Sequence, residues 1–199
     1  ANLIWGGALS PAGNVIAHGA GTGSGTLNLE AERIDFGFGP FTQPAGVASF
    51  DRLALGFANV NLKASGQVTA NHKGSLSVYQ AQGAYETGKG YQVSGGNLNI
   101  STPLLTGDAG SAHSYTAGGA LKVAAPAGAA PAAPIKNNDA LGAQLALNGD
   151  SVTVATAVVL PSGKLTISAQ HDISVADGAR IDMAGRKSTF FDVDKYSWG

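Results

Sequence analysis

The sequence predicts an all-β protein, a parallel β-helix in which each turn of the chain stacks on the previous one. The first observation behind this prediction is a short motif, Gly-x-Leu-x-(Leu/Ile/Val), that recurs along the chain. Its copies occupy residues 25–29, 74–78, 96–100, 119–123 and 163–167. The middle leucines Leu76, Leu98 and Leu121 are 22 and 23 residues apart, which indicates turns of about 20–26 residues. This interval is typical of a solenoid, because a single turn buries its apolar side chains only against neighbouring turns.

The second observation is a shorter spacing inside each turn. The apolar pair Leu145 and Leu147 is followed seven residues later by Val152 and Val154. The same step leads from 27/29 to 34/36 and from 53/55 to 60/62, and steps of eight lead from 165/167 to 173/175 and 181/183. Apolar and small polar residues alternate within each strand, which places one face inside and one outside. About three strands per turn predict a triangular cross-section.

The repeat also predicts an interior column and a set of corners. We expect the repeated leucines to stack in one column: Leu76, Leu98, Leu121, Leu145 and Leu165. Corners are expected where Gly, Asn and Asp gather, because these residues tolerate the positive φ of tight turns. Such clusters occur at residues 71–74, 94–96, 148–150, 161–163 and 176–178.

Three stretches interrupt the repeat within what we expect to be one continuous β-helix over residues 1–199. Residues 37–50 are long and rich in Phe, and residues 79–95 hold three tyrosines among Gln and Gly. Residues 124–140 are rich in Pro and Ala, and Pro cannot donate to a strand ladder. We therefore expect the 124–140 loop to bulge from the coil. No signal peptide is visible, and the last residues do not resemble a polar cap, so we expect a segment of a longer protein.

Composition narrows the classes of partner. The net charge is −1, which argues against nucleic acid as the main partner. No stretch approaches ~20 apolar residues, so no membrane-spanning segment is expected. Cysteine is absent, so stability is expected to come from the repeats and not from disulfides.

No pattern of catalytic, cofactor-binding or metal-binding residues emerges from the sequence, and we do not expect an enzyme. Polysaccharide lyases and hydrolases on β-helices need clustered acids, but three aspartates recur at steps of five and would fall on different faces: Asp172, Asp177 and Asp182. Asp192 and Asp194 share one side of a strand, yet calcium requires 6–8 oxygens. No two of the four histidines have the spacing of metal ligands. The Gly-rich residues 21–25 are not followed by the Lys and the helix that a phosphate-binding loop requires.

The aromatic residues offer the best candidates for ligand contact. Tyr79, Tyr85 and Tyr91 are spaced by six in a polar stretch. A tyrosine presents a flat face and a hydroxyl, which suits sugars and protein partners. The alternative for these tyrosines is a structural role. The phenylalanines around residues 36–57 are expected to stack inside the coil.

Several runs of this sequence resemble the large exoproteins of the filamentous haemagglutinin family. They are Asp35–Pro44, Gly74–Gln80, Thr102–Gly107, Val158–Leu165 and Ile181–Arg186. The resemblance implies a right-handed parallel β-helix that an outer-membrane transporter exports by two-partner secretion. It also implies a secreted protein displayed on the surface of a Gram-negative bacterium. The secretion motif and the Arg-Gly-Asp triplet of the family are not found in this sequence.

These observations lead to one expected function and two alternatives. We expect a structural shaft segment of a filamentous adhesin that mediates cell adhesion or bacterial aggregation. Its partners would be a host-cell or bacterial surface receptor or a glycan. The first alternative is a β-helix that binds or degrades polysaccharide. The second is the stalk of a contact-dependent growth inhibition toxin.

Overall fold

The computed structural model describes residues 2–5, 23–38, 45–132, 134–135 and 139–185. These residues form strands β1–β17 and no helix, and most of the strand pairs are parallel. The prediction of an all-β chain built mainly from parallel ladders is confirmed. Nowhere in the described residues is there a helix with the length and apolar character needed to cross a membrane. Several sequence candidates lie outside the described residues, namely His18, Phe41, Asp192 and Asp194.

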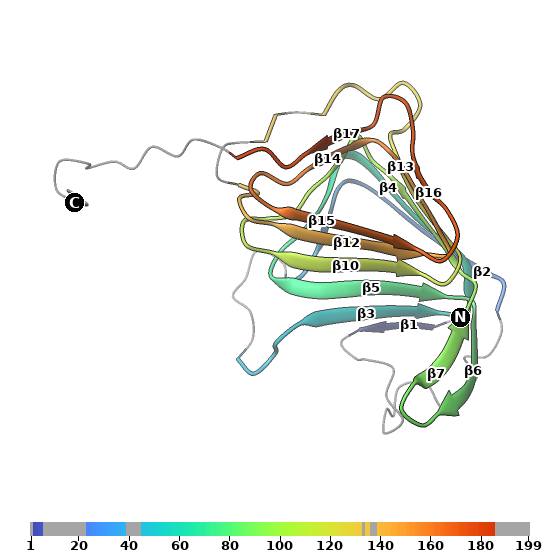
Figure 1. Cartoon of the computed structure of the whole chain (residues 1–199). Coiled ribbons are helices and arrows are strands. Elements are labelled where there is room, and N and C mark those ends of the chain that lie inside the picture. Colours follow the sequence, from blue (N-terminus) through green and yellow to red (C-terminus); the bar gives the residue numbers. More distant parts are fainter. Residues whose placement is uncertain (1, 6–22, 39–44, 133, 136–138, 186–199) are drawn as a thin grey trace.

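One face of the molecule is a six-stranded sheet with the order β1-β3-β5-β10-β12-β15. Its strands are β1 (Asn2–Trp5), β3 (Phe50–Leu55), β5 (Lys73–Tyr79), β10 (Ala112–Ala117), β12 (Gln144–Gly149) and β15 (Lys164–Ala169). All neighbours pair in parallel except β1, which runs antiparallel to β3. Figure 1 shows the strands of this sheet stacked in sequence order.

The remaining faces belong to a nine-stranded sheet that curls strongly (Figure 1). Its strands are β2 (Gly25–Phe36), β4 (Phe57–Ala70), β8 (Asn97–Ser101), β9 (Leu104–Leu105), β11 (Ala120–Ala124), β13 (Ser151–Ala155), β14 (Ala157–Val159), β16 (Ile173–Val175) and β17 (Arg180–Asp182). The long strands β2 and β4 pair with each other along most of their length, with register shifts on the way. In later turns the corresponding path is divided into two short strands, such as β13 and β14.

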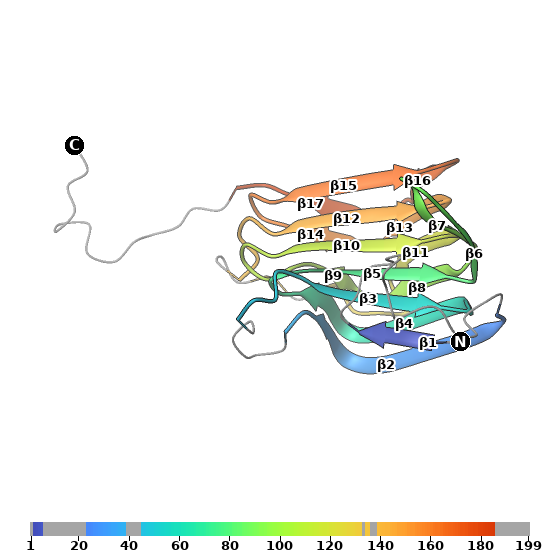
Figure 2. The same cartoon turned by 90° about the horizontal axis from the view of Figure 1, so that it is seen from below.

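The chain alternates between the two sheets, as the steps of seven predict. Leu145 in β12 is followed seven residues later by Val152 in β13, which lies in the other sheet. Each turn then pairs with its neighbours in parallel, and Figure 2 shows the resulting layers from the side. This arrangement is consistent with a β-solenoid.

The core consists of stacked apolar side chains inside the coil. Val60, Leu98, Leu121 and Val152 are register partners along the curled sheet, and each is at most 1 % exposed. On the six-stranded sheet the corresponding column contains Leu76, Tyr115, Leu147 and Ile167. Parallel register keeps each column on one face because side chains alternate along a strand.

The predicted single leucine column is wrong. Leu98 and Leu121 lie in the curled sheet, whereas Leu76, Leu145 and Leu165 lie in the six-stranded sheet. The step from Leu145 to Leu165 is a true turn of 20 residues, because the two are register partners. The step from Leu76 to Leu98 only crosses from one sheet to the other.

The three interrupting stretches lengthen individual turns. Gly74 and His113 are register partners 39 residues apart, because this turn contains an antiparallel hairpin, β6 (Ala81–Glu86) and β7 (Gly90–Ser94). In the 124–140 loop, Ala124 ends β11, and the described residues from 125 to 140 form no strand. The turn that contains β11 therefore contributes no strand between β9 and β14, and these two strands pair directly with each other. In the 37–50 stretch, the rings of Phe38 and Phe50 lie 5.0 Å apart.

Candidate functional site

The tyrosines of residues 79–95 are placed on and beside the β6–β7 hairpin, which projects from the body of the coil (Figures 1 and 2). Tyr85 and Tyr91 are cross-strand register partners. Their ring centroids lie 5.3 Å apart at an interplanar angle of 69°, an edge-to-face pair. The Tyr85 side chain is 40 % exposed, and Tyr91 is half-buried. The hairpin therefore presents an aromatic pair to solvent.

The tip of the hairpin is held by local contacts. Gly88 and Gly90 have φ of +82° and +87°, values that favour glycine. The amide of Lys89 donates to the carbonyl of Glu86 at 3.0 Å, and Lys89 Nζ lies 2.9 Å from Glu86 Oε2. This closed turn fixes the register that brings the two tyrosines together.

Tyr79 has a different environment from the other two tyrosines. It is the last residue of β5, and its ring lies against Gly118, where a Cβ would come within 2.8 Å of Tyr79 Cδ1. Burial raises the pKa of the Tyr79 hydroxyl, and a hydrogen bond with Ser77 acts in the opposite direction. The structure thus places Tyr85 and Tyr91 together, with Tyr79 packed at the base of the hairpin.

The aspartates considered for catalysis occupy separate positions. Asp172 precedes β16, Asp177 lies in the corner after it, and Asp182 ends β17. Asp182 accepts a hydrogen bond from Arg180 at 2.7 Å and one from the amide of Ala184 at 3.0 Å. These contacts are local and structural.

The described histidines are also separated. His171 Nδ1 contacts Asp150 Oδ1 at 2.8 Å on the surface, and His72 Nδ1 contacts the side chain of Asn71 at 2.8 Å. His113 is buried inside the coil. Within the described ranges, no group of three or more His, Cys, Asp or Glu residues could hold a metal ion.

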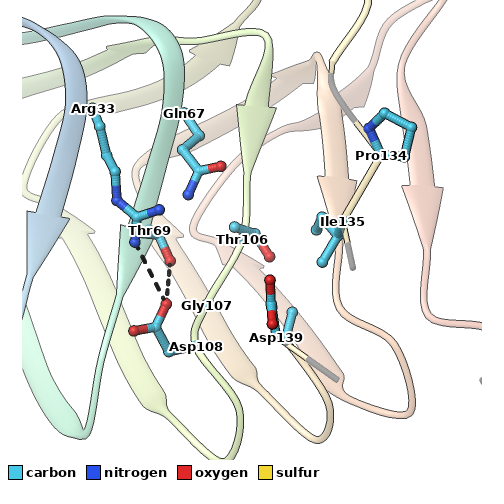
Figure 3. Close-up of a pocket in the computed structure, with 10 residues that line it drawn as sticks. Arg33, Gln67, Thr69, Thr106, Gly107, Asp108, Pro134, Ile135 and Asp139 are labelled. Carbon is cyan, nitrogen blue, oxygen red and sulfur yellow. Dashed lines mark hydrogen bonds and ion pairs between the residues drawn. The ribbon is translucent and has the colours of Figure 1, made fainter. Parts of the chain in front are cut away.

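A polar groove that the sequence did not indicate lies beside the 124–140 loop. Its volume is about 410 Å³, within the range of small-molecule sites. Figure 3 shows its lining. The groove is lined by Arg33 from β2, Gln67 and Thr69 from β4, Thr106, Gly107 and Asp108 after β9, and Pro134, Ile135, Asp139 and Ala140 from the loop.

Charged groups sit at both sides of this groove. Arg33 Nε contacts both carboxylate oxygens of Asp35, at 3.0 and 2.8 Å, and Arg33 Nη2 lies 3.8 Å from Asp108 Oδ1. These carboxylates raise the pKa of Arg33. Thr69 Oγ1 donates to Asp108 Oδ1 at 3.2 Å. Asp139 makes no hydrogen bond or ion pair with another residue of the described part.

Sequence reasoning missed the groove because nothing in the local sequence marks it. Arg33 and Asp108 are 75 positions apart and come together only when the turns stack. Thr106, Gly107 and Asp108 follow a strand of two residues, which reads as an ordinary corner.

The chain matches no protein-family model, and searches of the curated proteins and of the solved structures find no significant match to it.

Proposed function

We propose that this chain is a structural shaft segment of a secreted filamentous adhesin displayed on a Gram-negative cell surface. In this proposal the parallel ladders continue as a right-handed β-helix of triangular cross-section, exported through an outer-membrane two-partner transporter. The sequence resemblance to filamentous haemagglutinins supports the secretion route. The stacked parallel strands support the shaft, because a ladder of this kind resists bending and holds attached elements at fixed positions.

The observation that carries the adhesive role is the Tyr85–Tyr91 pair on the projecting hairpin. Two paired aromatic rings, each of which carries a hydroxyl, can stack on a sugar ring or anchor in a pocket of a protein receptor. The antiparallel pairing fixes the rings before binding, which lowers the conformational entropy lost on contact. Tyr79 contributes by packing the base of the hairpin against the coil.

The direct test is binding of the purified chain to a glycan array and to fixed host and bacterial cells. We expect the double variant Tyr85→Ala/Tyr91→Ala to lose binding, because it removes both rings while leaving the coil intact. The matched control is Thr87→Ala, at the tip of the same hairpin, which should bind like the unmodified chain. Binding retained by the double variant would reject the tyrosine pair as the contact surface.

Two further measurements address the class and the location of the protein. Antibodies against the chain should label intact source cells, and inactivation of the partner transporter should abolish that label. A label found only after the cells are opened would contradict surface display. Turnover of any polysaccharide by the purified chain would contradict the non-enzymatic role.

A further inference from the structure

We propose that the groove between Arg33, Thr69, Asp108 and Asp139 is a binding site for a short neutral saccharide. The groove is formed by three successive turns of the coil, which contribute β2, β4 and the residues after β9, and by residues 134–135 and 139–140 of the loop (Figure 3). It is separate from the β6–β7 hairpin, since none of its lining residues belongs to that hairpin. The proposal therefore does not depend on the adhesive role of Tyr85 and Tyr91.

The groove offers hydrogen-bond donors at one side. The Arg33 side chain is 48 % exposed, and its Nε is directed to Asp35. The nearest carboxylate oxygen to Arg33 Nη2 is 3.8 Å away, which is longer than a hydrogen bond. The terminal guanidinium N–H groups therefore make no hydrogen bond to the described residues and can donate to a ligand. Gln67 adds an amide that both donates and accepts.

Acceptors dominate the rest of the groove. The Asp139 carboxylate has no hydrogen-bond partner within the described ranges and lies in the loop wall. Asp108 accepts from Thr69 and retains further lone pairs. Thr106 Oγ1 donates to the carbonyl of Val159 at 2.7 Å, which leaves its own oxygen free to accept.

This combination of hydrogen-bond donors and acceptors matches the hydroxyl groups of a sugar. A hydroxyl both donates and accepts, so neighbouring hydroxyls of one ring can accept from Arg33 and donate to Asp108 or Asp139. Among the described residues at the groove, the carboxylates of Asp35, Asp108 and Asp139 outnumber the one cation, Arg33, and this excess of negative charge disfavours anionic ligands. Pro134 and Ile135 supply an apolar surface for the C–H face of a ring.

The floor of the groove is rigid. Thr69 is 1 % exposed and Thr106 is 4 % exposed, and both hydroxyls are held by the hydrogen bonds to Asp108 and Val159. Ala140, which closes the loop end of the groove, is 1 % exposed and anchors that wall in the core. Polar groups fixed in this way bind with a smaller loss of conformational entropy.

The experiment titrates saccharides into the complete ¹⁵N-labelled chain. The measured quantity is the NMR chemical shift of the backbone amides of Thr69, Gly107 and Asp108. The probes are neutral trisaccharides of glucose, galactose, mannose and N-acetylglucosamine, with trigalacturonate as the anionic comparison. We expect at least one neutral probe to shift these amides in a saturable way and trigalacturonate to leave them unchanged. The proposal is overturned if no neutral probe shifts them, or if trigalacturonate does so more strongly.

Variants then locate the site. Asp139→Ala and Arg33→Gln should each weaken saccharide binding by about tenfold or more, the effect of losing one hydrogen bond to a charged group. Asp177→Ala, in an exposed corner outside the groove, is the matched control and should bind like the unmodified chain. Unchanged affinity in Asp139→Ala, with the fold verified by its unfolding curve, would reject the groove.

A last variant separates this proposal from the adhesive hairpin. Tyr85→Ala/Tyr91→Ala should keep the amide shifts in the groove even where it loses binding to cells. If the double variant abolishes the shifts of Gly107 and Asp108, the saccharide binds at the hairpin and the groove proposal fails.

Discussion

Gly74 and His113 are register partners on neighbouring turns, and the imidazole ring of His113 fills the space that a side chain on Gly74 would need. A Cβ on Gly74 would lie 2.8 Å from both Cε1 and Nε2 of His113, and it would also meet the carbonyl oxygen of Phe50. Gly74 is the first residue of one copy of the Gly-x-Leu motif. At this copy the glycine provides room for a side chain of the next turn.

We therefore expect Gly74→Ala to destabilise the fold by about 1–3 kcal/mol, the usual cost of overpacking a filled interior. The measurement is urea unfolding followed by circular dichroism. Gly83→Ala is the matched control, because a Cβ there would meet its nearest neighbours at an ordinary 3.6 Å. A Gly74→Ala variant as stable as Gly83→Ala would show that the His113 ring does not occupy this space.

His113 should make the protein sensitive to acid. Burial is the main cause that lowers the pKa of His113 to about 4, and the charge of Arg52 adds to it. The backbone of Asn71 and the Asp51 carboxylate act in the opposite direction. The unfolded chain, with a histidine pKa of ~6.5, binds the proton first as the pH falls. Stability is therefore unaffected by this group above about pH 6.5, falls as the pH drops from about 6.5 to 4, and stays reduced below that.

The expected slope in this window is about 1.4 kcal/mol per pH unit for one group. Urea midpoints at several pH values should show it, and His113→Leu should flatten it, because a leucine continues the column of Leu145 and Leu165. His171→Gln changes a surface histidine and should keep the acid destabilisation. If stability falls with pH as steeply in His113→Leu as in the unmodified chain, groups other than His113 cause the acid destabilisation.

The sequence predicted the strands and corners better than it predicted their register. Steps of seven such as Leu145 to Val152 correspond to the passage between sheets, because local alternation of apolar and polar residues determines each strand. The corner at Pro161-Ser162-Gly163 is present, with Ser162 at φ +51°. The pairing of the strands depends on the lengths of the insertions between them. The repeat motif does not show which insertions lengthen a turn.

The leucine column failed for this reason. In register, Leu76 corresponds to Leu147 and Leu98 corresponds to Val152. The passage from Leu147 to Val152 takes five residues, and the passage from Leu76 to Leu98 takes 22, so the additional length is 22 − 5 = 17. The β6–β7 hairpin and its flanking residues supply this length, which is close to that of a whole turn. A true turn in the curled sheet is the step of 23 from Leu98 to its register partner Leu121.

The corrected interior columns predict which substitutions destabilise the fold most. Leu98 is fully buried between Val60 and Leu121, so Leu98→Ala should cost about 2–5 kcal/mol, through lost burial and a residual cavity. Ile173 is 52 % exposed at the end of the same column, where it pairs with Val152, so Ile173→Ala should cost much less. Thermal unfolding of both variants measures the difference. Equal losses would contradict the assignment of Leu98 to the interior.

The first turn shows a second limit of pattern reading. Leu53 and Leu55 resemble the repeated apolar pairs, but they are register partners of Ser77 and Tyr79, whereas Leu76 pairs with Arg52. Arg52 thus takes an interior position, where it is 6 % exposed, donates to the carbonyl of Gly37 at 2.9 Å and stacks over the Phe50 ring. Burial lowers the pKa of Arg52 to about 10. A shift of one residue in register exchanges the two faces of a strand, and the local sequence does not show it.

The last prediction concerns the hydroxyl of Tyr115, a residue with no exposed surface. Its ring packs edge-on against Phe36 at 5.6 Å, and burial raises the pKa of its hydroxyl. The Oη atom has no hydrogen-bond partner among the described residues. A buried polar atom without a partner costs about 1–3 kcal/mol, so Tyr115→Phe should keep the ring packing and stabilise the fold by about 1 kcal/mol.

Urea unfolding at neutral pH measures this gain, with Tyr85→Phe as the matched change on an exposed ring, where we expect almost no effect. Tyr115→Leu should destabilise, because it removes the aromatic contact with Phe36 as well as the hydroxyl. A Tyr115→Phe variant that loses stability would show that the hydroxyl has a stabilising partner. The interior beside Arg52 and His113 would then be a hydrogen-bonded polar cluster and not a strained gap in an apolar column.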